Sequence, residues 1–254
     1  MTDRHDEFGQ LATAFDAMAS RLQVMQEANQ RLLQDVSHEL RSPLARLNVA
    51  VEIARNKGSG QVGSELDRIE LESERLKSLV NDVLGLLRES SETVPKVYED
   101  IELNALLSDL VEVVNYEVPA GKPGIAWSPQ EAITCHGDRE LLWRAMENLL
   151  RNALRHTDPE QGVVLSLEQG RGRRRVHISV RDYGPGLPDN ELGKIFEPFY
   201  RVQESRDRGS GGHGLGLSIA ANAVRRHGGS IEAGNADGVG LVVMISLPLN
   251  RDSA

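Results

Sequence analysis

The first 36 residues carry apolar positions at helical spacing. From Leu11 to Val36 the steps alternate between four and three residues, which is the heptad pattern of a coiled coil, and Asn29 is its polar member. Such a helix buries its stripe only against another helix, so the pattern predicts a partner. The stripe consists of Leu11, Phe15, Met18, Leu22, Met25, Asn29, Leu32 and Val36.

The heptad pattern is interrupted close to residue 38, where the steps become four, four, four and three. An extra four-residue step locally unwinds a supercoil. Two interpretations stay open, a mechanical signal read at this point and an irregular seam without function. The stripe continues through Leu40, Leu44, Leu47, Val51 and Ala54.

A turn with the sequence N-K-G-S-G at 56–60 leads to a second amphipathic helix. One hairpin cannot bury both stripes, and each fully buried Leu or Val is worth roughly 1.5 to 3 kcal/mol. We therefore expect a homodimer whose two hairpins form a four-helix bundle. The second stripe consists of Val62, Leu66, Ile69, Ser73, Leu76, Val80, Val83 and Leu87.

After a stretch at 90–100 that is typical of a linker, the pattern becomes that of a mixed α and β domain. Helical spacing covers 104–118, 138–155 and 215–226, and Asp138 is a good N-cap for the second of these helices. Strand patterns cover 124–127, 133–135, 163–168, 176–181, 230–233 and 239–247. Helices and antiparallel strands in one unit predict an α+β fold with a two-layer sandwich.

Composition narrows the class of protein. The formal charge of -9 and the pI near 5.3 argue against general binding to nucleic acid or anionic lipid. Cys135 is the single cysteine, which fits a reducing compartment and excludes an internal disulfide. The sequence has no apolar run of about 18 residues and no signal peptide, so we expect that this stretch neither spans a membrane nor is exported.

The first candidate site is S-H-E-L-R-S-P-L at 37–44. His38 lies between the apolar positions Val36 and Leu40, about 200° of helical rotation from each, so its ring is expected to face water. Glu39 can fix the tautomer of this imidazole, which could then act as a nucleophile at neutral pH. An ordinary surface pair of histidine and glutamate is the alternative.

Two further motifs follow in the mixed domain. Asn148 and Asn152 in E-N-L-L-R-N share a helix face, where their side-chain oxygens could bind Mg²⁺. Asp182 opens D-Y-G-P-G-L after a strand and could accept a hydrogen bond from an exocyclic amine, while Gly184 and Gly186 would let the backbone approach a flat ring. Surface asparagines and a simple turn are the alternatives.

The last motif is S-G-G-H-G-L-G-L at 210–217, which opens a helix. Glycines before a helix N-terminus expose backbone N–H groups that can bind an anion. It is preceded by F-E-P-F-Y-R at 196–201 and by a glycine-rich stretch at 202–212 that is typical of a mobile lid with aromatic anchors. Each motif alone has a structural explanation, but all of them in this order favour one nucleotide site.

In this order the motifs resemble those of bacterial sensor histidine kinases of two-component systems. S-H-E-L-R-S-P-L is similar to the phosphoacceptor box, and N-L-L-R-N, D-Y-G-P-G, F-E-P-F-Y-R and G-G-H-G-L-G-L are similar to the N, G1, F and G2 boxes. The ATP-binding fold of that family is shared with gyrase and Hsp90-type ATPases. The stretch at 6–11 resembles a HAMP linker, and the closing S-L-P-L resembles Cpx-type envelope-stress kinases.

The resemblance implies a division into a HAMP end and signalling helix at 1–26, a dimerisation and phosphotransfer hairpin at 27–92, a linker at 93–100 and an ATP-binding domain at 101–250. It also implies that this is the cytoplasmic portion of an inner-membrane protein. ATP and Mg²⁺ would be bound, and the partners would be a second copy and the receiver domain of a response regulator. Neither the stimulus nor the choice between cis and trans transfer follows from the sequence.

By position, the resemblance makes His38 the phosphoacceptor, with Glu39 orienting its ring. Asn152 would bind Mg²⁺, Asp182 the adenine amine, and Arg155 and Arg201 the γ-phosphate. Asn148 stands where related ATPases have a general-base glutamate. The implied nucleotide-binding residues are Asn148, Asn152, Arg155, His156, Asp182, Gly184, Gly186, Arg201, Gly212, His213, Gly214, Leu215, Gly216 and Leu217, and the implied catalytic residues are His38, Glu39, Ser42, Arg155 and Arg201.

Two positions depart from the common pattern of the family. Ser42 stands where many relatives that also dephosphorylate their partner have Thr or Asn, although a serine hydroxyl can still orient a water. His213 stands where Thr or Ser is frequent, and it could contact a phosphate or cap the lid. Two other classes remain as alternatives, a gyrase/Hsp90-type ATPase that forms no phosphoprotein and a non-catalytic signalling scaffold.

Overall fold

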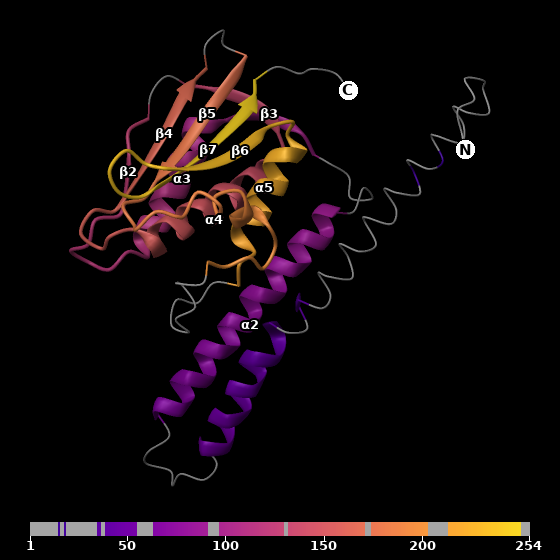
Figure 1. Ribbon diagram of the computed structural model, residues 1–254, viewed down its shortest axis with the longest axis vertical. Coiled ribbons are helices and arrows are strands. Elements are labelled where there is room, and N and C mark those ends of the chain that lie inside the picture. Colours follow the sequence, from indigo (N-terminus) through magenta and orange to yellow (C-terminus); the bar gives the residue numbers. More distant parts are fainter. Residues whose placement is uncertain are drawn as a thin grey trace. The chain divides into compact units, whose positions relative to one another are not determined.

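The computed structural model describes residues 15, 18, 35–36, 39–54, 63–90, 97–129, 132–170, 174–202 and 213–249 (Figure 1). The predicted coiled-coil register around Asn29 and the predicted exposure of His38 lie outside these residues, as does the predicted lid at 202–212 apart from Val202. The chain divides into two compact units, Met1–Leu79 and Val80–Ala254. None of the described helices is long and apolar enough to cross a membrane.

The first unit contains most of the predicted helical hairpin, whose second helix continues into the second unit. Residues 39–54 are helical, and helix α2 spans Gly63–Ser90, so both predicted helices are confirmed over the described residues. Arg46 on the first helix forms an ion pair with Glu72 on α2, which joins the two helices. Among the hairpin side chains that the structure describes, the buried ones are Pro43, Ala50, Glu72 and Leu79.

The predicted apolar stripes are only partly correct within one chain. Leu44 is 47% exposed and Leu66 is 57% exposed, although the spacing assigns both to a buried face. Two helices share a single seam, so apolar side chains on the other faces stay in water. The large apolar side chains that these helices leave exposed are Leu44, Val49, Ile53, Leu66, Leu71 and Val80.

The second unit is built on a five-stranded sheet with the strand order β2-β4-β5-β7-β6. Its strands are β2 (Ile125–Trp127), β4 (Val163–Gln169), β5 (Arg175–Arg181), β6 (Ser230–Asn235) and β7 (Leu241–Pro248). The pairs β4–β5, β5–β7 and β6–β7 are antiparallel as predicted, but β2 and β4 are parallel. That pair differs because the chain between its strands contains a long helix, which allows a crossover connection.

Three helices lie against one face of this sheet (Figure 1). They are α3 (Leu103–Tyr116), α4 (Arg139–His156) and α5 (Gly216–Arg226). In β5 the alternate residues Val176, Ile178 and Val180 are buried and form part of the core. The predicted two-layer α/β sandwich is confirmed.

A second, two-stranded sheet corrects the predicted linker. β1 (Glu99–Glu102) pairs antiparallel with β3 (Thr134–Gly137), so the stretch at 90–100 ends inside a strand. Ile101 is the one buried residue of β1, and a strand this short shows no alternation from which it could be recognised. A short 3₁₀ helix, η1 (Lys194–Phe196), precedes the aromatic motif.

Candidate active site

Helix α4 carries the two asparagines of the predicted metal site. The Asp138 carboxylate accepts a hydrogen bond from Leu141 N at 3.1 Å, which confirms the predicted N-cap. Asn148 and Asn152 are half-buried, one turn apart on this helix. The buried face of α4 consists of Leu142, Ala145, Met146, Leu149, Leu150 and Ala153.

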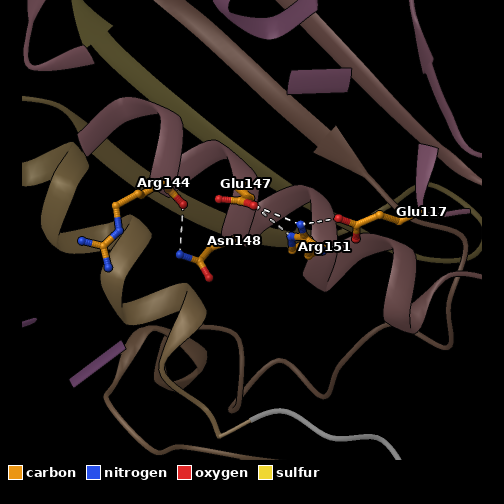
Figure 2. A network of polar contacts seen from close by, with 5 residues as sticks. All are labelled: Glu117, Arg144, Glu147, Asn148 and Arg151. Carbon is orange, nitrogen blue, oxygen red and sulfur yellow. Dashed lines mark hydrogen bonds and ion pairs between the residues drawn. The ribbon is translucent and has the colours of Figure 1, made fainter. Parts of the chain in front are cut away.

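The Asn148 side chain lies between its own helix and the start of α5. Its Nδ2 donates a hydrogen bond to the Arg144 carbonyl oxygen at 2.9 Å (Figure 2). Its Oδ1 faces the start of α5, where a Cβ added to Gly216 would lie 2.9 Å from it. A Cβ at this position would displace the end of the Asn148 side chain, so the structure brings the N motif and the glycine-rich motif together.

Asp182 lies at the end of β5 and is 5% exposed. Its Oδ1 accepts hydrogen bonds from Gly184 N at 2.9 Å and from Leu241 N at 3.0 Å. A carboxylate has about four acceptor positions on two oxygens, so these backbone bonds fix the group while Oδ2 keeps its own acceptor capacity. This arrangement suits recognition of an exocyclic amine.

Gly184 and Gly186 shape the loop after Asp182. A Cβ on Gly184 would lie 2.3 Å from the His156 carbonyl oxygen, so this loop packs directly on the end of α4. Gly186 has φ +72, in the left-handed region that favours glycine. Both predicted glycines therefore have a backbone reason to be there.

Two polar residues that support this loop were missed from the sequence. Thr157 Oγ1 donates to the Gly162 carbonyl and accepts from Tyr183 N at 3.0 Å, which ties the end of α4 to the loop. Asn235 Oδ1 accepts from Leu187 N at 2.8 Å, and its Nδ2 donates to Leu187 O at 2.7 Å. Thr157 and Asn235 each bond to a loop residue that is distant in sequence, so no local sequence pattern predicts these contacts.

The described part of the glycine-rich motif is joined to the aromatic motif. Phe199 N donates to Gly214 O at 2.9 Å, and Gly214 has φ +73. Leu215 is buried, and α5 then starts at Gly216 with no side-chain cap on its N-terminus. Uncapped N–H groups in the first turn can serve an anion, as the sequence predicts.

Positively charged side chains lie at the C-terminal end of α4, next to the Asp182 loop. Burial lowers the pKa of Arg155 below its ordinary value, and the charge of Arg201 lowers it further, so these two guanidinium groups interact. Burial also lowers the pKa of His156, with Arg155 lowering it and Asp182 raising it. The structure thus groups Arg155, Arg201, His156 and Asp182 in one electrostatic environment.

Arg151, one turn before Arg155, belongs to a separate network. Figure 2 shows its guanidinium between Glu147 and Glu117, and its Nη2 donates to both carboxylates, at 3.1 Å and 2.8 Å. The Glu117 hydrogen bond raises the pKa of Arg151 above its ordinary value. This arginine is committed to two carboxylates, which distinguishes it from Arg155.

The remaining predicted site residues lie in the hairpin, at the start of α5 or outside the described residues. His38 and Gly212 lie outside the described residues, and Glu39 and Ser42 belong to the hairpin, where Glu39 is half-buried and Ser42 is exposed. His213 and Leu217 are half-buried at the start of α5. Within the described ranges, no group of three or more His, Cys, Asp or Glu side chains could hold a metal.

Two family models match the chain. The His Kinase A (phospho-acceptor) domain matches residues 28–92, and the histidine kinase-, DNA gyrase B-, and HSP90-like ATPase matches residues 137–251. The second match contains Asn148, Asp182 and Gly216, the residues around which the site is built. The chain is thus similar to a phospho-acceptor domain and an ATPase domain of the histidine kinase type, in that order.

Individual relatives agree with this family. The sensor histidine kinase CpxA of Escherichia coli (strain K12) is 38% identical over 250 residues, which are 97% of this chain and 53% of the relative. The chain thus spans about half the length of the curated relatives that it matches.

Two solved structures share the fold. The crystal structure of full-length ShkA in complex with AMPPNP is 28% identical, has a TM-score of 0.62 and is matched over 89% of this chain and 47% of that chain. Histidine kinase ThkA in complex with the response regulator protein TrrA is 22% identical, has a TM-score of 0.73 and is matched over 93% of this chain and 65% of that chain.

Proposed function

We propose that this chain is an ATP-dependent histidine autokinase of a two-component system, which phosphorylates His38 and passes the phosphoryl group to an aspartate of a response regulator. One observation carries the proposal. A buried carboxylate, Asp182, is fixed by two backbone N–H groups and acts electrostatically on His156, the residue next to Arg155. The family match of the hairpin supplies the phosphoacceptor segment.

Asp182 would bind the adenine of ATP. Its Oδ2 can accept a hydrogen bond from the exocyclic amine, and the Gly184 and Gly186 backbone can lie against the ring because neither residue has a side chain. A hydrogen bond to a charged acceptor contributes roughly 1.5 to 3 kcal/mol. The AMPPNP that ShkA binds supports a nucleotide in this site.

The phosphates would lie between α4 and the start of α5. The uncapped N–H groups of α5, beginning at Gly216, and the guanidinium groups of Arg155 and Arg201 would neutralise their charge. His156, whose pKa is lowered by desolvation and by the charge of Arg155, would border the same region. In that arrangement His213 would be near the phosphates rather than the adenine.

Asn152 would hold Mg²⁺. Side-chain carbonyl oxygens fit this ion, which takes few protein ligands and completes its shell with phosphate oxygens and water. The ion would shield the charge that develops between the β- and γ-phosphates. Asn148 cannot abstract a proton from water as a glutamate could, so the chemistry of the site favours transfer to a side chain over hydrolysis.

His38 would be the nucleophile of the proposed step. A ring nitrogen attacks the γ-phosphorus, the bond from that phosphorus to the β,γ-bridging oxygen breaks, and ADP leaves. Glu39 would accept the hydrogen bond of the other ring N–H and so keep the attacking nitrogen unprotonated. The phosphohistidine would then react with the carboxylate of a receiver aspartate, and the solved complex of ThkA with a response regulator supports a partner of this class.

The hairpin supports a homodimer. Leu44, Leu66 and Val80 are among the large apolar side chains that one chain leaves exposed, and burying them against a second hairpin would make the predicted four-helix bundle. The proposed division is a signalling helix at 1–26, the hairpin at 27–92, a linker from 93 that ends before β1, and an ATP-binding domain that begins with β1 (Glu99–Glu102). A monomer at micromolar concentration in light scattering would contradict the dimer. The membrane attachment of a longer protein stays a prediction from the resemblance.

Time courses with γ-labelled ATP and Mg²⁺ separate this function from its two alternatives. The kinase predicts label that stays on the protein and little release of free phosphate. A gyrase/Hsp90-type ATPase predicts steady phosphate release without phosphoprotein. A non-catalytic scaffold predicts neither, even with nucleotide bound. Asn152→Ala is the matched variant, and it is expected to remove the metal-dependent label.

A further inference from the structure

A chain of three polar side chains crosses the helical hairpin. Arg46 donates two hydrogen bonds to Glu72, from Nε to Oε1 at 2.9 Å and from Nη2 to Oε2 at 3.0 Å. Its third nitrogen, Nη1, donates to Ser42 Oγ at 2.6 Å. The guanidinium therefore connects a carboxylate on α2 with a hydroxyl one turn earlier on its own helix.

Burial holds this arrangement in place. The Glu72 side chain is 3% exposed, whereas the Arg46 side chain is 36% exposed. A bidentate pair between guanidinium and carboxylate has a defined plane, and a buried carboxylate is costly to leave without its cation. Glu72 thus sets the plane of Arg46, and that plane directs Nη1 at Ser42.

The hydrogen bond from Arg46 determines what the Ser42 hydroxyl can do. A hydroxyl has one proton and two lone pairs. Because the guanidinium occupies one lone pair, the proton points away from Arg46 and the second lone pair stays available. Ser42 is exposed, so a reactant can reach it.

Ser42 follows His38 by four residues in the sequence, the spacing that places two side chains on one face of a helix. We infer that Arg46 and Glu72 are positioning residues that orient the Ser42 hydroxyl for dephosphorylation of the response regulator. This inference rests on the proposed function, because it needs a phosphorylated regulator at the hairpin.

The chemical step is a hydrolysis in which Ser42 forms no covalent bond. A water molecule donates a hydrogen bond to the second lone pair of Ser42 Oγ, and its oxygen attacks the phosphorus of the regulator's acyl phosphate. The bond between that phosphorus and the aspartate oxygen breaks. The aspartate leaves as a carboxylate, and both protons of the water leave with the inorganic phosphate.

The ion pair also joins the two helices, so a purely structural role is the competing explanation. The two roles differ in their dependence on Ser42. A structural role of Arg46 and Glu72 acts whether or not the hydroxyl is present, whereas a positioning role disappears with it. A double-mutant cycle therefore separates them.

The experiment uses the whole chain, γ-labelled ATP and a receiver domain that takes label from the wild-type chain. Arg46→Lys keeps a charge opposite Glu72 but has a single nitrogen and cannot also reach Ser42. Glu72→Gln keeps the shape and removes the charge that holds the guanidinium. Ser42→Ala removes the hydroxyl, and Ser42→Thr, which keeps it, is the matched control.

The quantity measured is the rate of receiver dephosphorylation divided by the rate of autophosphorylation. This ratio is expected to fall about tenfold or more in Ser42→Ala and about threefold to tenfold in Arg46→Lys and Glu72→Gln. Ser42→Thr, which keeps the hydroxyl, is expected to keep this ratio close to that of the wild type. In the Ser42→Ala background, Arg46→Lys is expected to add less than about a twofold change.

Three results would overturn the inference. They are an equal loss of both rates in Arg46→Lys and Glu72→Gln, an effect of Arg46→Lys that is the same with and without the Ser42 hydroxyl, and a wild-type chain that labels the receiver but never dephosphorylates it. A wild-type chain that forms no phosphoprotein would instead overturn the proposed kinase activity itself.

Discussion

Asp182 and Leu241 exchange hydrogen bonds in both directions. Asp182 N donates to the Leu241 carbonyl oxygen at 3.0 Å, and Leu241 N donates to Asp182 Oδ1 at 3.0 Å. The adjacent Gly240 has φ +106, and a Cβ there would lie 1.9 Å from the Asp182 carbonyl oxygen. The start of β7 therefore sets the direction of the carboxylate, and a glycine makes that approach possible.

Asp182→Asn is expected to weaken ATP binding while the domain stays folded. The amide oxygen can still accept the hydrogen bonds from Gly184 N and Leu241 N, but an NH₂ group would face the adenine amine, and two donors cannot bond. The expected loss is about tenfold to a hundredfold in Kd, because a hydrogen bond to a charged group contributes roughly 1.5 to 3 kcal/mol. Isothermal titration with ATP measures it, and unchanged affinity would contradict the assignment.

Gly216→Ala is expected to weaken binding of Mg²⁺-ATP about tenfold, because its Cβ would lie 2.9 Å from Asn148 Oδ1 and would displace that side chain. Gly193→Ala is the control, since Gly193 has φ -77 and no atom within 4 Å of the added Cβ. Titration of both variants against the wild type provides the comparison. Equal affinities for the two would show that Asn148 and Gly216 do not border the phosphates.

Two arginine variants are expected to differ in what they change: Arg155→Ala the rate of phosphoprotein formation, and Arg151→Ala the free energy of unfolding. Removing Arg155 is expected to slow formation of phosphoprotein by about a thousandfold, the scale of an arginine that stabilises a transferring phosphoryl group. Removing Arg151 breaks half-exposed ion pairs with Glu117 and Glu147 and is expected to lower the free energy of unfolding by about 1 kcal/mol or less. Initial labelling rates and urea unfolding measure the two effects.

The reverse pattern, with slow labelling in Arg151→Ala and normal labelling in Arg155→Ala, would contradict the assignment of the two arginines.

The folded domain is expected to lose stability in acid because the His227 ring is buried as the neutral form. Its Nε2 accepts a hydrogen bond from Asp138 N at 2.9 Å and its Nδ1 bonds the Ala223 carbonyl at 2.7 Å, so the folded state needs a neutral ring. Burial lowers its pKa below the ordinary value of 6.5. The unfolded chain therefore binds the proton more tightly, and stability present above pH 6.5 falls as the pH drops below that value.

His227→Gln is the test of this linkage, because glutamine keeps an acceptor for Asp138 N and does not titrate. Each pH unit below 6.5 is expected to cost the wild type up to about 1.4 kcal/mol from this group. Burial lowers the pKa of His156 as well, so some acid dependence is expected to remain. Urea unfolding from pH 7.5 to pH 5 measures both proteins, and identical slopes would exclude His227 as the source.

Local patterns predict most of the elements that carry the site. Asp138 indicates the start of α4, because an N-cap residue bonds to an N–H group only three residues later. The alternation at 176–181 predicts β5, because every second side chain of that strand is buried. Gly214 and Gly216 are visible as a motif for the same reason, since their backbone constraints act over a few residues.

The features that the sequence does not reveal depend on distant partners. Asn235 forms two hydrogen bonds with the backbone of Leu187, 48 residues away. Thr157 accepts a hydrogen bond from Tyr183 N across a loop. Glu72 is buried although it is charged, because Arg46 on the other helix neutralises it. No periodicity in one segment contains these contacts, which form only when the fold brings the segments together.

The most direct measurement incubates the purified chain and its His38→Ala variant with γ-labelled ATP and Mg²⁺ and scores protein-bound label after acid and after base. A histidine autokinase is expected to carry label that survives base and is lost in acid, which is the behaviour of a phosphohistidine. The His38→Ala variant is expected to carry no label while it still binds ATP. Label that persists on His38→Ala, or that survives acid, would contradict the assignment of His38 as the phosphoacceptor.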